Sequence, residues 1–97
     1  MKTTAEILRI LKEYKPEVER KYGLSRIGIF GSVARGEQHE GSDVDVCYEG
    51  SVPTLLTLDR LQTELEHLLG TPVDMVRIRQ GMNPLLNKRI RKEAIYV

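Results

Sequence analysis

The sequence predicts an α/β (α+β) fold, a small sheet flanked by helices, built as one domain over residues 1–97. A chain of 97 residues is long enough for one compact core and leaves little room for a second. Segments with apolar residues at helical spacing alternate with short apolar stretches that are typical of strands. The composition, with 40% hydrophobic and 30% charged residues, is ordinary for a globular domain.

The first expected element is a helix that begins near Thr3 and ends at Gly23. Thr3 and Glu6 have the spacing of a capping box, and glycine commonly ends a helix. The apolar positions recur at helical intervals: Ile7, Leu8, Leu11, Tyr14, Val18 and Tyr22. Pro16 lies inside this stretch and is expected to kink or break the helix, or to start a second one.

A short buried strand over residues 25–30 is expected next, followed by a turn at Gly31 and Ser32. Residues 33–35 are too few for more than one helical turn, and residues 38–42 are polar and typical of a loop.

Residues 43–48 alternate as a strand does, so that successive side chains point to opposite faces. One face carries Val44, Val46 and Tyr48, and the other carries Asp43, Asp45 and Cys47.

The second half of the chain predicts a helix, a strand and a final helix. The first of these helices opens at Pro53 and Thr54 and closes at Gly70. Its apolar stripe consists of Leu55, Leu58, Leu61, Leu65, Leu68 and Leu69. Residues 73–78 are expected to form a strand, and residues 84–94 a basic helix.

The charges are unevenly distributed, although the net charge is only +1. Residues 37–59 contain acids and no Lys or Arg, whereas residues 77–92 contain bases and no acid. An acidic stretch can bind cations, and a basic stretch can bind phosphates or an acidic partner. A solvated helix face is the alternative for most of the basic residues.

Two function classes are disfavoured. No stretch approaches the roughly 18 apolar residues that a membrane span needs, and the N-terminus lacks a charged-then-apolar leader. Direct nucleic-acid binding is not expected, because one Phe, four Tyr and no Trp offer few surfaces for stacking bases. The single cysteine, Cys47, cannot form an internal disulfide, which fits a cytoplasmic protein.

Gly31 and Ser32 are candidate phosphate-binding residues, because they follow a strand and precede a possible helical turn. Glycine lets backbone N–H groups approach a phosphate closely, and serine adds a hydroxyl donor. A plain tight turn is the alternative.

Asp43 and Asp45 are candidate metal ligands, because alternate residues of a strand share a face. Two ionised carboxylates repel one another, and Mg²⁺ would offset that repulsion while also binding substrate phosphates. An exposed sheet face that carries two solvated acids is an equally open interpretation.

Asp74 lies within the apolar stretch of the strand expected at residues 73–78, where a charge needs a partner. If that strand lies beside the strand of Asp45, three carboxylates could hold two metal ions for in-line displacement at phosphorus. The alternative is a structural ion pair of Asp74 with Arg77 or Arg79.

These motifs together resemble a known family. Gly31-Ser32, then ten residues, then Asp43-x-Asp45 resembles the signature of the DNA polymerase β-like nucleotidyltransferases. Residues 31–37, Gly-Ser-Val-Ala-Arg-Gly-Glu, and residues 42–46 resemble the minimal nucleotidyltransferases, which are often encoded beside a HEPN-domain toxin and act as its antitoxin. The resemblance covers essentially the whole chain and implies the fold of that family, with a small mixed sheet.

The resemblance also implies roles for the motif residues. Gly31 and Ser32 resemble the turn that binds the β- and γ-phosphates of the nucleotide. Asp43 and Asp45 resemble the Mg²⁺ ligands. Asp74 resembles the third carboxylate, which can ligate metal and help deprotonate the attacking hydroxyl.

Arg35 matches a frequent arginine of the motif. A phosphate contact and an ion pair with Glu37 are both open for it, and the structural role is slightly favoured.

The implied reaction is the transfer of AMP from ATP to a hydroxyl, a tyrosine of the partner HEPN toxin, with two Mg²⁺ ions. This modification would neutralise the toxin. One alternative is a non-catalytic antitoxin that blocks the toxin by contact, and another is a nucleotidyltransferase that acts on a nucleic-acid 3′ end.

Overall fold

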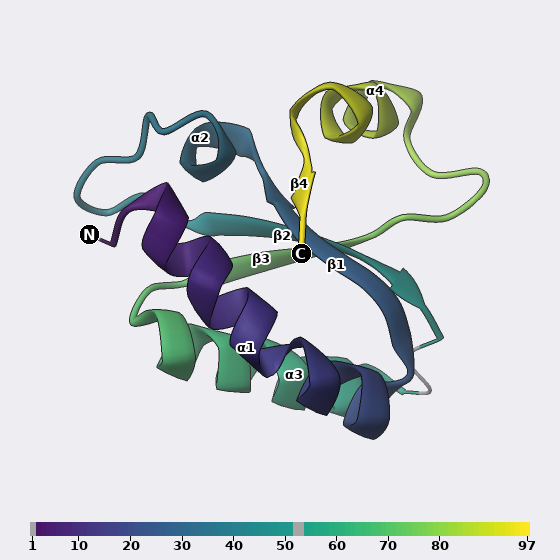
Figure 1. Ribbon diagram of the computed structural model, residues 1–97. Helices are drawn as coiled ribbons and strands as arrows, with labels where there is room; N and C mark the ends of the chain where they lie inside the picture. Colours follow the sequence, from purple (N-terminus) through teal and green to yellow (C-terminus); the bar gives the residue numbers. More distant parts are fainter. Residues whose placement is uncertain (1, 52–53) are drawn as a thin grey trace.

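The structure is a computed structural model that describes residues 2–51 and 54–97. Helices and strands follow one another along the chain (Figure 1) as α1 (Thr4–Tyr22), β1 (Leu24–Phe30), α2 (Gly31–Ala34), β2 (Val44–Gly50), α3 (Leu55–Leu69), β3 (Val73–Arg77), α4 (Pro84–Glu93) and β4 (Ile95–Tyr96). The predicted mixture of helices around a small sheet is therefore confirmed.

The strands form a mixed sheet in the order β3-β2-β1-β4. Strand β1 is antiparallel to both β2 and β4, whereas β2 and β3 are parallel. A parallel pair needs a crossover connection, and α3 supplies it between β2 and β3. Helices α1 and α3 lie on one face of the sheet and α4 lies on the other (Figure 1).

Helix α1 begins as the sequence predicts, with a complete capping box between Thr3 and Glu6, and it ends at Gly23 with φ of 69°. The expected break at Pro16 was wrong, because the helix is continuous through it. Pro16 and Lys12 are both exposed, so water can solvate the carbonyl of Lys12 that loses its hydrogen bond. Leu11 and Val18 are buried on either side and hold both halves of the helix against the core.

The main core lies between the sheet and helices α1 and α3, and the predicted alternation of β2 is confirmed. Val44, Val46 and Tyr48 are buried in this core. The apolar stripe of α3 was wrong at Leu55, which is 85% exposed, and at Leu68, which is 39% exposed. Leu55 is the first residue of the helix, next to the N-cap Thr54, and lies one turn before Leu58 reaches the core. Pro53, the other expected start residue, lies outside the described residues.

The final strand β4 was not predicted, because two residues carry no usable alternation. It pairs Tyr96 with Gly28 and Ile95 with Ile29 on β1. A Cβ atom at Gly28 would lie 2.5 Å from the carbonyl oxygen of Ile95 and 3.0 Å from the Cα of Tyr96, so the pairing requires glycine there. This pairing fixes the end of α4 beside β1. Among the described helices, none is long and apolar enough to cross a membrane.

Candidate active site

Three aspartates gather at one end of the sheet, and we call them the acidic cluster: Asp43, Asp45 and Asp74. Asp45 on β2 and Asp74 on β3 are register partners of adjacent parallel strands. Asp43 directly precedes β2, two residues from Asp45. The predicted juxtaposition of Asp74 with Asp45 is therefore confirmed.

The three members of the acidic cluster differ in burial. Asp45 is partly buried, whereas Asp43 and Asp74 are exposed. The expectation that Asp74 occupies a buried position was wrong, because β3 is an edge strand of the sheet. An ion pair with Arg77 or Arg79 was the alternative for Asp74. Within residues 2–51 and 54–97, none of the ion pairs includes a member of the acidic cluster.

The electrostatics of Asp45 would favour binding of a cation. Partial burial raises the pKa of Asp45, and the nearby carboxylate of Asp74 raises it further, while Arg89 on α4 lowers it. A raised pKa means that the surroundings disfavour the ionised form of Asp45. A bound divalent cation would stabilise that form.

No group of three or more Asp, Glu, His or Cys side chains in the described residues is arranged to hold a metal ion by itself. Mg²⁺ does not require such a cage, because it typically binds through one or two carboxylates together with substrate phosphates and waters. The acidic cluster fits a Mg²⁺ ion on this ground, and the two-ion site stays a prediction.

Gly31 is in direct contact with the acidic cluster, which the sequence did not reveal. It is buried, its φ is 74°, and a Cβ atom placed on it would collide with Oδ2 of Asp45 and lie 3.2 Å from its Cγ. The turn at Gly31 and strand β2 are therefore packed against each other, which is possible because Gly31 has no Cβ atom. Ser32 is partly buried, and its hydroxyl makes no hydrogen bond within the part of the chain that the structure describes.

Arg35 forms the ion pair with Glu37 that the sequence suggested, with Nε 3.1 Å from Oε2. It also forms a second ion pair, with its Nη1 2.7 Å from Oε1 of Glu93 on α4. The hydrogen bond to Glu37 is the main reason that the pKa of Arg35 is raised. A phosphate contact of Arg35 stays a prediction.

Glu93 is a residue that sequence reasoning missed. Its Oε2 accepts a hydrogen bond of 3.1 Å from the backbone N–H of Gly31, while its Oε1 holds Arg35. Glu93 therefore links α4 to the glycine turn across 62 residues of sequence. In the sequence it is one acid at the end of a basic helix, and no local pattern connects it to Gly31.

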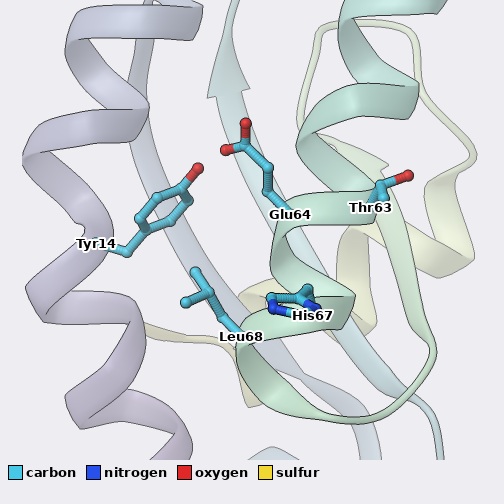
Figure 2. Close-up of a pocket in the computed structure, with 5 residues that line it drawn as sticks. All are labelled: Tyr14, Thr63, Glu64, His67 and Leu68. Carbon is cyan, nitrogen blue, oxygen red and sulfur yellow. The ribbon is translucent and has the colours of Figure 1, made fainter.

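An apolar hollow lies elsewhere, between α1 and α3 on the opposite side of the sheet. Figure 2 shows its lining residues, which are Tyr14, Thr63, Glu64, His67 and Leu68. Its carboxylate, Glu64, is already bound by Lys21 at 3.0 Å and by the hydroxyl of Tyr22 at 2.9 Å. The hollow thus offers no unpaired acid, and the acidic cluster remains the candidate active site.

Cys47 is fully buried beside the acidic cluster on the same face of β2, as expected for a small packed residue. Burial raises the pKa of the Cys47 thiol to about 11. We expect a disulfide reagent such as DTNB at pH 8 to label the folded protein at least about 100-fold more slowly than the urea-unfolded protein, because the thiolate is the reactive form. The absorbance of the released thiol measures this directly, since Cys47 is the single cysteine. Equal rates in both states would contradict the burial of Cys47.

The chain is similar to known proteins over most of its length. The family model described as a nucleotidyltransferase domain matches residues 11–97. The chain belongs to the nucleotidyltransferase family. Among relatives of this nucleotidyltransferase, the protein adenylyltransferase MntA of Thermococcus cleftensis is 39% identical over 98 residues, covering 100% of this chain and 98% of MntA.

Solved structures give the same fold. A protein assigned as a minimal nucleotidyltransferase is 39% identical, with a TM-score of 0.76 over 97% of this chain and 95% of that chain. An antitoxin of the minimal nucleotidyltransferase type, solved with a tri-AMPylated HEPN toxin from Shewanella oneidensis, is 19% identical with a TM-score of 0.59. That match covers 96% of this chain and 66% of the other, and at this identity it shows the fold alone.

Proposed function

We propose that this nucleotidyltransferase attaches AMP from ATP to a tyrosine hydroxyl of a partner HEPN toxin, with Mg²⁺, and thereby neutralises the toxin. The observation that carries the proposal is the contact of Gly31 with Asp45, next to Asp74. This contact joins a turn suited to phosphate with carboxylates suited to a metal ion. Nucleotidyl transfer needs both at one point, because Asp43 and Asp45 would hold a metal ion that would neutralise charge on phosphates held at the Gly31 turn.

The comparisons support the protein acceptor and the toxin partner. The Thermococcus relative is named a protein adenylyltransferase. The Shewanella complex pairs an antitoxin with a HEPN toxin that carries three AMP groups. A cytoplasmic location belongs to the same proposal, since it suits a chain with one cysteine.

Each candidate site residue would have a separate role. Asp43 and Asp45 would hold Mg²⁺, with Asp74 as the third carboxylate, and the bound metal would neutralise charge on the phosphates. Gly31 and Ser32 would hold the β- and γ-phosphates with a backbone N–H and the unoccupied hydroxyl. These contacts fix the α-phosphorus in front of the acceptor.

In the transfer step, the acceptor oxygen bonds to the α-phosphorus, and the bond from that phosphorus to the bridging oxygen breaks. Pyrophosphate leaves with the electron pair. In this scheme Asp74 would accept the hydroxyl proton, because it is exposed on the edge strand β3 and is the register partner of Asp45.

The rival is an antitoxin that works by contact alone and keeps a disused site. The acidic cluster argues against it, because Asp45 and Asp74 repel one another and neither forms an ion pair within the described residues, which destabilises a fold that does not use them. A nucleic-acid 3′ end as acceptor is a further rival, which the same assay tests.

The proposal is tested by incubating the protein with Mg²⁺, ATP and the protein encoded next to it. We expect label from α-³²P-ATP on the neighbour and none from γ-³²P-ATP, because AMP and not phosphate is transferred. Asp43→Asn should reduce the label by about 10³-fold or more. Neutralisation of the neighbour without ATP, unchanged by Asp43→Asn, would establish the contact rival, and label on added RNA would establish the other.

A further inference from the structure

Arg89 on α4 lies next to the candidate active site without belonging to any motif. Its guanidinium carbon is 5.7 Å from the ring centre of Phe30, the last residue of β1. Phe30 is the register partner of Asp45 and directly precedes Gly31. Arg89 is also the cation whose charge acts most strongly on Asp45. It therefore borders both the phosphate turn and the acidic cluster.

Glu93 connects Arg89, Arg35 and the backbone of Gly31. Its carboxylate accepts a hydrogen bond from the N–H of Gly31 at 3.1 Å, binds Arg35 at 2.7 Å and lies 4.0 Å from Nη2 of Arg89. Only 17% of the Glu93 side chain is exposed, and the pairing of β4 with β1 holds the helix end in place. Arg89 therefore lies beside Phe30 on a helix that the sheet holds in place, and not on a loop.

The two arginines beside Glu93 differ in availability. Arg35 is held by two carboxylates at 3.1 and 2.7 Å, so its donors are largely occupied. The one ion-pair contact of Arg89 within the described residues is the 4.0 Å approach to Glu93, which is longer than a hydrogen bond, and 54% of its side chain is exposed. Arg89 keeps its planar fork of donors free, and such a fork suits a phosphate.

We infer that Arg89 binds the β- and γ-phosphates of the nucleotide substrate, so that α4 supplies one wall of the nucleotide site and Glu93 is the residue that positions it. The inference rests on the proposed function and adds a contact that lies outside the Gly-Ser and Asp-x-Asp motifs. A purely structural role for Arg89, packing on Phe30, is the competing explanation.

Isothermal titration calorimetry with Mg²⁺ and α,β-methylene-ATP tests the inference, because this analogue cannot be cleaved between its α- and β-phosphates. Competition with AMP gives the affinity for a nucleotide that lacks the β- and γ-phosphates. The variants are Arg89→Ala, Arg89→Lys and Lys88→Ala. Lys88 is the matched control, since its substitution removes the same charge from an exposed neighbour on the same helix.

We expect Arg89→Ala to weaken binding of the triphosphate analogue roughly 10- to 100-fold, the usual effect of losing a hydrogen bond to a charged group. AMP affinity should change by less than about 2-fold, and Lys88→Ala should change neither affinity by more than about 2-fold. Arg89→Lys should bind the analogue with intermediate affinity, because it keeps the charge but loses the fork.

Four outcomes would overturn the inference. If Arg89→Ala loses affinity equally for the analogue and for AMP, Arg89 only maintains the shape of the site. The same conclusion follows if Arg89→Ala lowers the melting temperature and Arg89→Lys restores both the melting temperature and binding. If the wild type binds the analogue and Arg89→Ala binds it equally well, Arg89 does not contact the phosphates, and the proposed function is unaffected. If the wild type does not bind the analogue, both the role of Arg89 and the proposed function are contradicted.

Discussion

Asp45→Asn is expected to reduce AMP transfer by about 10³-fold or more while leaving the fold intact. Asparagine has the size of aspartate, so it keeps the contact with Gly31. It lacks the negative charge that would hold Mg²⁺. Measuring label transfer from α-³²P-ATP by the wild type and the variant, at equal protein and partner concentrations, checks the loss of activity.

The same substitution is expected to raise the melting temperature slightly at neutral pH in metal-free buffer. The pKa of Asp45 is raised in the folded state, mainly by burial and then by Asp74. A raised folded-state pKa favours folding below the unfolded value, near 3.8, and this contribution is lost as the pH rises through the folded value. The advantage of Asp45→Asn should therefore shrink as the pH falls and vanish below about pH 3.8.

Thermal melts of both proteins from pH 3 to pH 8 measure this difference. Asp59→Asn is the matched control, because Asp59 is exposed on α3 and the ion pairs of the described residues do not include it. Adding Mg²⁺ with nucleotide should then stabilise the wild type and not Asp45→Asn. Retention of transfer by Asp45→Asn, or a large loss of stability at neutral pH, would contradict the metal-ligand role.

The sequence was sufficient where a local pattern decides the structure. Alternation along residues 43–48 placed Asp43 and Asp45 on one face. The sequence brought Asp74 to them only on the condition that the two strands are neighbours, which the parallel pairing of β2 with β3 fulfils. Pro16 was misjudged because its effect depends on whether the carbonyl of Lys12 faces water, which periodicity does not show.

The contacts that unite the site could not be predicted, because they join residues far apart in the sequence. Glu93 reaches Gly31 only because β4 pairs with β1 and turns the end of α4 toward the glycine turn. The position of Arg89 near Asp45 depends on the same placement of α4. The resemblance to nucleotidyltransferases identified the motif residues, whereas the wall that α4 forms becomes visible only in three dimensions.

Gly31 is the residue whose importance the structure changed most. The sequence suggested that glycine lets a phosphate approach the backbone. The structure adds that Gly31 leaves room for the carboxylate of Asp45, in a backbone conformation that side chains rarely adopt. These two constraints can be separated, because they respond differently to substitutions at Asp45.

Gly31→Ala is expected to lower the free energy of unfolding by at least about 2 kcal/mol and AMP transfer by about 10²-fold or more. The left-handed backbone accounts for about 1 kcal/mol of this loss, and the collision of the new methyl group with Asp45 accounts for the rest. Urea titrations and the α-³²P-ATP assay measure the two losses.

Gly36→Ala separates the two constraints at a matched position. Gly36 has φ of 71°, close to the 74° of Gly31, but a Cβ atom there meets nothing within 4 Å. It should cost about 1 kcal/mol of stability and leave transfer nearly unchanged.

In an Asp45→Ala background the obstructing carboxylate is gone, so Gly31→Ala should cost only as much as Gly36→Ala does. The difference between the two backgrounds is the coupling energy of the turn and the acidic cluster. A coupling energy of zero would mean that the turn and the metal-ligand strand do not depend on each other, and that Gly31 serves the backbone alone.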